Sequence, residues 1–337
     1  MPPNKASPNR LSTRLFFGLS PNLDILEADA KQAEFSQNFW HYINKRVNQT
    51  RLNNGYDTLK QNTSLLNKVS QKYGVPDYIL VAFLGLESNY GTYTGKLSLI
   101  QSLATLAFDP RRSDFFAREL VTLLKLIDKG KIPIDAKGSW AGAMGAVQFM
   151  PSNVLAYGVD ADKDGDIDLW SSQDDIYASA ANFLKHLGWK KGEKWGREVT
   201  IPKNFDYRLT GLQNKKKVTE WGSLGVQKAN GSALPNSSME GSLIVPMGHQ
   251  GPAFLVYQNF RVILGWNRSQ LYALSVGYLA DRINGQGRLR AKPLDEPLLS
   301  KEDILSIQET LNILGYDAGV ADGVLGPKTR AATRQFQ

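Results

Sequence analysis

The sequence contains no cysteine, which removes several classes of chemistry at once. Without cysteine there is no disulfide framework, no thiol nucleophile, no cysteine-based zinc site and no lipidated cysteine. The sequence also lacks any apolar run near the roughly 20 residues that a membrane helix needs. Its first twenty residues lack the basic, apolar and small-residue order of a signal peptide. We therefore expect a soluble chain, stabilised by packing, in which no export signal is visible.

A strong excess of one charge is also missing. The sequence has 40 Lys and Arg against 32 Asp and Glu, which gives a formal net charge of +8. That balance suits an anionic partner such as nucleic acid, a membrane surface or an acidic cell wall. The basic residues are scattered except at 215–217, which we interpret as a solvated loop, and no nucleic-acid-binding signature is present. We expect no nucleic-acid partner.

The first half of the chain has the pattern of an all-helical protein. With 337 residues, 42% of them apolar, the chain can bury one large core and a small satellite domain. Apolar residues recur at helical spacing from Gln32 to Val75, which predicts two amphipathic helices. Pro76 and Asp77 then open a helix whose residues 79–86 are continuously apolar, so we expect it to be buried on all sides. Further helices are expected over residues 98–107, 113–129 and 174–187.

Short β-favouring stretches replace this pattern after Trp195. Clusters of Gly, Pro, Asn and Ser separate them, as is typical of a small antiparallel sheet. The stretches are residues 198–201, 242–245 and 253–257. Helical spacing returns over 269–283, and residues 285–297 are rich in Gly, Pro and charge, as linkers between domains tend to be.

These patterns predict an α+β chain that is mainly α. We expect a large helical domain over residues 1–288 that contains a β-rich subdomain at about 196–262. A linker at 289–299 and a small helical module at 300–337 would follow. The sequence shows no repeat of the length typical of solenoids.

Glu87 is the most suggestive single residue, because it lies at the end of the apolar helix. Phe83 and Leu84 precede it by one turn, and Gly91 just after it is typical of a helix terminator. Burial and the negative end of the helix dipole both disfavour a charged carboxylate. We therefore expect a raised pKa, which a general acid for a glycosidic oxygen requires. For an isolated glutamate, an ordinary surface position at a helix end is the commoner explanation.

Four sequence motifs follow one another in a characteristic order. They are LESNYG at 86–91, GSWAGAMGAVQFMPS at 138–152, GPAFLVYQNF at 251–260 and WNRSQLYALSVGYLADRI at 266–283. Together they resemble the lytic murein transglycosylase B family, and several motifs in register are more specific than any one alone. The resemblance covers roughly residues 19–287. It implies a lysozyme-like helical catalytic domain with a groove for alternating N-acetylglucosamine and N-acetylmuramic acid.

In this resemblance Glu87 occupies the position of the sole catalytic carboxylate. Most glycosidases use two carboxylates, and substrate-assisted enzymes are an exception. The resemblance implies that Glu87 protonates the leaving oxygen while the muramic acid's own acetamido oxygen attacks the anomeric carbon. Glu87 would then deprotonate the 6-hydroxyl, which closes a 1,6-anhydro ring without consuming water. The implied activity is lytic cleavage of the β-1,4 bond between N-acetylmuramic acid and N-acetylglucosamine.

The resemblance also implies a set of substrate-binding residues. Gln148 can donate and accept hydrogen bonds to an N-acetyl group, and the small residues around it let backbone approach a sugar. A tight turn without a ligand is the alternative for this segment. Ser139 and Asn267 match positions that line the groove, and Asn267 would hold the acetamido group. The other implied positions are the sugar-stacking Tyr272, Trp266 and Phe183, and Arg111 and Arg112, which meet stem-peptide carboxylates or simply start a solvated helix.

An acidic loop forms a separate candidate site. Residues 160–168, DADKDGDID, reproduce the first nine positions of an EF-hand loop, with oxygen ligands at alternate positions and glycine at the sixth. Position 12 is Ser171 instead of the closing glutamate, and the resemblance implies a longer loop that Asp174 closes. A bare polar turn is the weaker alternative, because clustered acids without a cation repel one another. We expect a structural Ca²⁺ remote from the chemistry, no organic cofactor, and as metal ligands Asp160, Asp162, Asp164, Asp166 and Asp174.

The sequence from Ser300 onward resembles the small helical peptidoglycan-binding module, with LGY, DG and GPKTR motifs. About 40 residues are near the limit at which an unstapled domain folds alone. We expect peptidoglycan glycan strands as the ligand, and cell-wall synthesis or divisome proteins as candidate partners. The expected location is the periplasm, with or without association with the outer membrane.

Two other functions stay open at this stage. A hydrolytic muramidase would cleave the same bond with water. It would use a second carboxylate, for which Asp109 and Asp114 are candidates. A non-catalytic wall-binding scaffold would keep the fold and the C-terminal module. The intact Glu87 and Gln148 argue against the scaffold.

Overall fold

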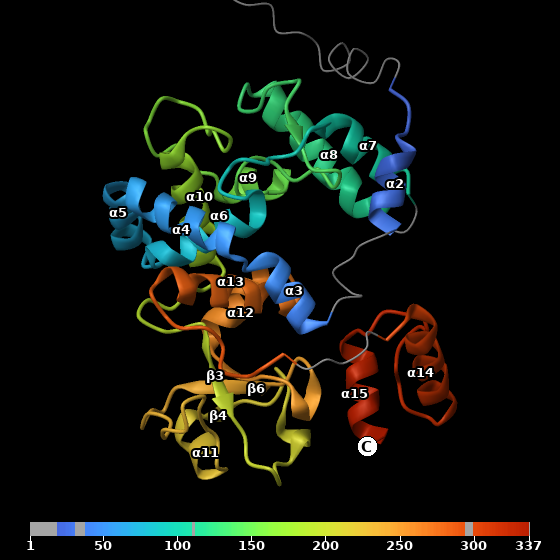
Figure 1. Cartoon of the computed structure of the whole chain (residues 1–337). Helices are drawn as coiled ribbons and strands as arrows, with labels where there is room; N and C mark the ends of the chain where they lie inside the picture. The colour runs from blue at the N-terminus through green and yellow to red at the C-terminus, as the bar shows by residue number, and fades with distance from the viewer. Residues whose placement is uncertain (1–18, 31–37, 110–111, 294–298, 337) are drawn as a thin grey trace, which may run out of the picture. The chain divides into compact units, whose positions relative to one another are not determined.

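A computed structural model describes residues 19–30, 38–109, 112–293 and 299–336, and Figure 1 shows the course of the chain. The described chain is mainly helical with small antiparallel sheets, which confirms the predicted fold class. It divides into two compact units. The first comprises residues 1–32, 62–69 and 83–183, and the second comprises residues 33–61, 70–82 and 184–337.

The first unit is a helical body. Its helices are α2 (Leu23–Ala30), α7 (Leu99–Ala107), α8 (Ser113–Asp128), α9 (Pro151–Tyr157) and most of α10 (Gln173–His186). Helix α7 packs along α8, and α8 packs on α9 (Figure 1). The Ser98 side chain caps α7 by accepting a hydrogen bond from the Gln101 backbone N–H at 3.4 Å. The predicted boundaries of α7, α8 and α10 are each confirmed to within about two residues.

Helix α6 (Asp77–Ser88) is the buried helix that the apolar run predicts. Every residue from Ile79 to Leu86 is buried, so the helix has no solvent-facing side over this stretch. It begins directly after Pro76, whose carbonyl oxygen accepts the Ile79 N–H at 3.1 Å. A helix held by packing on all sides fixes the position of the residues at its end.

The stretch predicted as two amphipathic helices forms three instead. They are α3 (Phe39–Arg46), α4 (Gln49–Gln61) and α5 (Thr63–Tyr73). Val47 leaves helical geometry, with φ −113° and ψ 60°, and the Asn48 side chain then caps α4 by accepting the Arg51 N–H at 2.9 Å. Apolar periodicity alone did not separate the three helices. The asparagine cap is the local signal that could have done so.

The second unit contains a five-stranded antiparallel sheet with the order β4-β6-β7-β3-β5. The strands are β3 (Gly196–Thr200), β4 (Lys216–Lys217), β5 (Gln227–Lys228), β6 (Glu240–Ile244) and β7 (Ala253–Val256). The three predicted stretches correspond to β3, β6 and β7. The edge strands β4 and β5 are two residues long, too short to show an alternating pattern, and were missed.

Helix α11 (Val218–Ser223) packs on this sheet (Figure 1). Its Trp221 is fully buried and donates an indole N–H to the Gly241 carbonyl oxygen at 3.0 Å. The sequence also missed α12 (Gln258–Trp266), which follows β7 directly and packs on α13 (Gln270–Ile283). Gly277 of α13 lies against the Trp195 indole, where an added Cβ would come within 2.3 Å of Cδ2.

The C-terminal residues form a small helical pair of their own. Helix α14 (Lys301–Ile313) starts with a capping box between Ser300 and Asp303, and α15 (Pro327–Phe336) follows. The buried Gln308 side chain accepts the Gly323 N–H at 2.9 Å and donates to Thr329 Oγ1 at 3.0 Å. This buried polar network helps a very small core to hold one structure.

Among the helices of the described residues, none combines the length and the apolar character that a membrane-spanning helix requires.

Candidate active site

Glu87 is the penultimate residue of α6 and is half-buried. The chain after the helix adopts three successive left-handed residues, Asn89 (φ 50°), Tyr90 (φ 62°) and Gly91 (φ 81°). The Ser88 hydroxyl accepts the Gly91 N–H at 2.8 Å and so ties the reversal to the helix end. Gly91, the predicted terminator, is thus the third residue of the reversal rather than the first. The arrangement holds Glu87 at the end of a rigid helix.

The glycine-rich segment forms two tight turns in succession. The Ser139 backbone N–H donates to the Ala143 carbonyl oxygen at 2.9 Å, and the Ser139 carbonyl oxygen accepts the Gly142 N–H at 3.0 Å. The Ser139 hydroxyl accepts the Ala143 N–H at 3.0 Å. Met144 and Phe149 then exchange two backbone hydrogen bonds of 2.8 and 3.0 Å. The Ser139 hydroxyl therefore shapes the loop, in addition to any contact with a sugar.

The glycines of this segment are required by the protein's own packing. Gly142 (φ 83°) and Gly145 (φ 66°) both adopt left-handed backbone geometry. An added Cβ at Gly145 would lie 2.4 Å from the Leu169 carbonyl oxygen, and one at Gly142 would lie 2.3 Å from Leu103 Cδ2. We predicted that these glycines let a sugar approach the backbone. In this structure Leu169 and Leu103 of the same chain make that close approach.

Gln148 connects this segment to the loop that follows Glu87. Its Nε2 donates to the Gly145 carbonyl oxygen at 2.9 Å and to the Thr94 carbonyl oxygen at 3.3 Å. Gln148 also has a left-handed φ of 49°, which is rare for a residue with a side chain. The structure thus brings together the loops of Glu87, Ser139 and Gln148. The contact with Thr94 has no signal in the sequence.

Backbone strain is concentrated in these two loops. In the part of the chain that the structure describes, four residues other than glycine have positive φ, namely Asn89, Tyr90, Gln148 and Lys163. Three of the four lie in the loops that carry Glu87 and Gln148. Strained residues persist only where their surroundings over-determine them, and they cluster at functional sites.

The predicted residues of the second unit gather at one corner, where α12 meets α13. Trp266 ends α12, Asn267 is its C-cap, and Tyr272 lies near the start of α13. The Asn267 side-chain oxygen accepts the Ser269 N–H at 2.9 Å, so it stabilises the corner. Trp266 and Asn267 are half-buried, whereas Tyr272 is only 2% exposed. Tyr272 therefore does not present an open face for stacking in this structure.

Phe183 is also a core residue. It is 6% exposed, stacks on Tyr157 with a centroid distance of 4.7 Å, and meets Phe149 edge-on at 5.3 Å. The predicted sugar-stacking role of Phe183 is not supported by this burial, because both neighbouring aromatic rings already cover it. Through Phe149 it supports the glycine-rich loop from behind.

The two predicted arginines have different outcomes. Arg112 is exposed, precedes α8, and its guanidinium carbon lies 5.1 Å from the Phe116 ring centroid. Arg111 lies outside the described residues.

Of the acids considered for a muramidase, Asp114 is exposed in the first turn of α8 and Asp109 is half-buried.

The acidic loop brings three of its five predicted ligands together. Carboxylate oxygens of Asp160, Asp162 and Asp164 all lie within 4.8 Å of one another. Asp166 instead lies 3.8 Å from the Lys131 ammonium group, and Asp174 is exposed in the first turn of α10. Neither belongs to the group of three in the described structure.

Asp175, which the sequence did not single out, holds this loop in shape. It is fully buried and accepts the backbone N–H groups of Ala161 at 2.7 Å and Asp168 at 2.8 Å. Burial is the main cause that raises the pKa of Asp175, and the neighbouring Asp162 adds to the shift. The sequence does not distinguish Asp175 from the adjacent Asp174. In the structure Asp175 lies on the buried face of α10 and Asp174 lies on the exposed face.

Comparison with protein families gives two matches that divide the chain. Residues 4–281 match the family described as "Transglycosylase SLT domain", and residues 300–337 match the "Putative peptidoglycan binding domain". The first match covers most of the chain and includes every residue of the two strained loops. The second covers the helical pair α14 and α15.

Individual relatives support the same assignment. The chain is 33% identical over 249 residues to "Membrane-bound lytic murein transglycosylase B" of Escherichia coli K12, covering 72% of this chain and 66% of that protein. Its structure is similar to SltB3 from Pseudomonas aeruginosa in complex with NAG-NAM-pentapeptide, with a TM-score of 0.91, 43% identity, and coverage of 96% and 88% of the two chains. It is also similar to the Escherichia coli lytic transglycosylase Slt35 in complex with calcium, with a TM-score of 0.71, 30% identity, and coverage of 82% and 87%.

Proposed function

Because the chain belongs to the transglycosylase SLT domain family, we propose that it is a lytic murein transglycosylase of peptidoglycan. It cleaves the β-1,4 bond between N-acetylmuramic acid and N-acetylglucosamine without water and leaves 1,6-anhydromuramic acid ends. The relative in Escherichia coli carries this activity in its name, and the similar Pseudomonas aeruginosa structure contains a muropeptide. The match spans just under two thirds of the Escherichia coli protein's length.

The observation that best supports this proposal is the pair of strained loops in the first unit. A half-buried carboxylate ends a rigid helix, and the Gln148 carboxamide joins the loop after it to the glycine-rich segment. Left-handed residues that are not glycine hold both loops. A structural turn does not need such strain, whereas a pre-organised active site can use it.

The proposed chemistry uses Glu87 twice. In its protonated form it donates its proton to the glycosidic oxygen as that bond breaks, and the substrate's acetamido oxygen forms the new bond to the anomeric carbon. The Glu87 carboxylate then takes the proton of the 6-hydroxyl, whose oxygen displaces the acetamido oxygen. The proton balance closes, and water does not enter. In this scheme Gln148 positions the sugar and Ser139 shapes the loop beside it, and Asn267 stays a predicted substrate-binding residue.

The products test this proposal directly. Muropeptides released from purified sacculi should end in 1,6-anhydromuramic acid, about 18 mass units lighter than hydrolysed ends because no water is added. These ends should also resist borohydride reduction, since the anomeric carbon carries no free hydroxyl. Mass spectrometry before and after reduction measures both properties. Predominantly reducible ends would show a hydrolytic muramidase, and no release at all would show a wall-binding scaffold.

We further propose that the acidic loop binds a structural Ca²⁺. Two oxygen ligands of one Ca²⁺ each lie at about 2.3–2.6 Å from it, so they lie within about 5 Å of one another. The oxygens of Asp160, Asp162 and Asp164 meet this condition at 4.8 Å. The similar Slt35 structure contains calcium. Asp166 and Asp174 stay predicted ligands, and Asp175 would act by holding the loop backbone.

Calcium should raise the melting temperature of the protein. Binding to the folded state alone stabilises it by about 2.7 kcal/mol when the free ion is at 100 times its dissociation constant. Asp160→Ala and Asp164→Ala should remove most of this shift, while Asp135→Ala, which removes an exposed acid outside the cluster, should keep it. Differential scanning calorimetry with calcium and with a chelator measures the shift. Identical melting curves for the wild type would leave the loop as a polar turn.

The C-terminal helical pair is proposed to tether the enzyme to its insoluble substrate, since residues 300–337 match a putative peptidoglycan-binding domain. A tether raises the local concentration of the enzyme on the wall. We propose a periplasmic location because peptidoglycan, the proposed substrate, lies there. Association with cell-wall synthesis or divisome proteins stays a prediction.

A further inference from the structure

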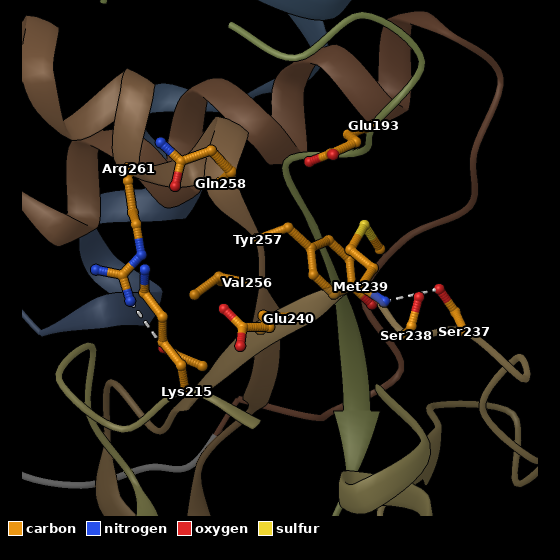
Figure 2. A pocket seen from close by; sticks show the side chains of 12 residues that line it. Glu193, Lys215, Ser237, Ser238, Met239, Glu240, Val256, Tyr257, Gln258 and Arg261 are labelled. Atoms are coloured by element: carbon orange, nitrogen blue, oxygen red, sulfur yellow. Dashed lines mark hydrogen bonds between the residues drawn. The ribbon is translucent and has the colours of Figure 1, made fainter. Parts of the chain in front are cut away.

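A cavity of about 410 Å³ opens in the second unit, in a part of the chain to which no role has been assigned (Figure 2). Its walls come from β6, the end of β7 and the first turn of α12, with the segments around Lys215 and Ser237 at the rim. The Tyr257 ring packs against Gly241, where an added Cβ would meet it at 3.0 Å. Gly241 therefore allows the Tyr257 ring to lie directly against β6.

Four charged side chains of both signs line this cavity. They are Lys215, Arg261, Glu193 and Glu240. In Figure 2, Arg261, Lys215 and Glu240 lie on one side of the Tyr257 ring and Glu193 lies on the other. No two of these four groups form an ion pair with each other within the described ranges. The side with Arg261 and Lys215 therefore keeps one positive charge in excess of Glu240 and is called the cationic side, and the opposite side carries Glu193.

Arg261 is the most informative of the four. Its Nη2 donates to the Ser242 hydroxyl at 2.9 Å and to the Leu212 carbonyl oxygen, so neutral acceptors hold the guanidinium at the wall. Burial lowers the pKa of Arg261, since no carboxylate compensates for the lost hydration. A partly buried cation without an acidic partner lowers the stability of the fold, because its lost hydration is not compensated by a carboxylate. An anionic group of a ligand would supply the missing partner.

The start of α12 adds to the cationic side. Its N-cap is Tyr257, which makes no side-chain capping hydrogen bond, and Gln258 is the first helical residue. Both residues line the cavity. The positive end of the helix dipole therefore acts in the same direction as Arg261 and Lys215.

The charges restrict the chemical class of the ligand. A polyanion such as nucleic acid would meet the carboxylates of Glu193 and Glu240, and a neutral sugar would leave Arg261 uncompensated. A short peptide with carboxylate and ammonium groups satisfies both sides. The volume lies near the lower end of the range of about 300–1,000 Å³ for ligand sites, which suits a few peptide residues and not a whole glycan strand.

We propose that this cavity is a second substrate site, which binds the peptide stem of peptidoglycan through Arg261 and Lys215 on one side and Glu193 on the other. This inference rests on the proposed function, because that function supplies a substrate that carries peptides. A peptidoglycan ligand with a pentapeptide is present in the similar Pseudomonas aeruginosa structure. Binding a stem here would hold a peptide-bearing strand near the enzyme between cleavage events.

Isothermal titration of the full chain with a purified, sugar-free stem tetrapeptide that contains a diamino acid tests the proposal. The titration uses the Glu87→Gln variant as host, so it needs no cleavage. We expect saturable binding at one site that Lys215→Glu weakens at least tenfold, because the exposed lysine becomes a repulsive acid. Lys203→Glu, the same charge change at an exposed residue of this unit outside the cavity, should leave binding unchanged.

The outcomes separate this inference from the proposed function. Absence of peptide binding, or binding that Lys215→Glu does not weaken, overturns the second site but leaves the anhydro products as evidence for the enzyme. Glu193→Gln should also weaken binding, because the peptide's ammonium group loses its acid. If Glu193→Gln instead tightened binding, the cavity would be a simple anion site and the peptide assignment would be wrong. Melting temperatures of all variants verify that each is folded.

Discussion

Glu87→Gln should abolish glycan cleavage while the fold and the binding of glycan are retained. The amide has almost the same shape as the carboxyl group, but it can neither donate the proton to the glycosidic oxygen nor take one from the 6-hydroxyl. General acid–base catalysis by one group contributes about 10²–10⁴-fold, and here one residue serves both steps. We expect a loss of at least about 10³-fold in the rate of muropeptide release, measured on purified sacculi by chromatography of the products.

Asp114→Asn is the matched control for this variant. Asp114 is an exposed carboxylate in the first turn of α8, and the muramidase alternative would recruit it as a second acid. Under the proposed mechanism the control should retain the wild-type rate. If Asp114→Asn lost activity as severely as Glu87→Gln and the products were reducible, two carboxylates would share the reaction and the single-acid mechanism would fail. Binding of both variants to sacculi shows that the comparison concerns chemistry.

The sequence was most informative where one physical requirement determined the pattern. Residues 79–86 are apolar at every position, which requires burial on all sides, and Pro76 and Asp77 before them favour a helix, which α6 is. Glu87 follows directly, so its half-buried place at the helix end could be inferred from its neighbours. The acidic loop was predictable for the same reason, since alternate acids and a glycine at fixed spacing suit one cation.

The sequence was least informative where contacts join distant segments. The hydrogen bond between Gln148 and Thr94 spans 54 positions, and no periodicity reports it. The burial of Tyr272 and Phe183 depends on which face of each helix turns inward, and motif matching alone does not resolve that choice. The cavity of the second unit draws Glu193, Lys215 and Arg261 from three separate segments of the chain, so their juxtaposition exists only in the folded chain.

Gly95 is the position where a single added methyl group should damage the active-site region most. Gly95 has a left-handed φ of 97°, and an added Cβ would lie 2.0 Å from the Gly138 carbonyl carbon and oxygen. It would also lie 2.5 Å from the Ser139 backbone nitrogen. These contacts are with backbone, which cannot rotate away as a side chain can. Gly95 thus permits the close approach at which β1 (Leu97–Ser98) pairs with β2 (Lys137–Gly138).

Gly95→Ala should therefore lower the free energy of unfolding by about 2–4 kcal/mol, the sum of about 1 kcal/mol for left-handed backbone and the cost of displacing the paired strand. Gly130→Ala isolates the first contribution, because Gly130 has φ 71° and no atom within 4 Å of an added Cβ. It should cost only about 1 kcal/mol in urea denaturation. Gly95→Ala should also reduce cleavage, because the adjacent Thr94 carbonyl oxygen accepts the Gln148 hydrogen bond that joins the two strained loops. Equal losses of stability in the two variants would mean that the β1–β2 contact relaxes freely, and that the approach of these strands does not constrain the loop after Glu87.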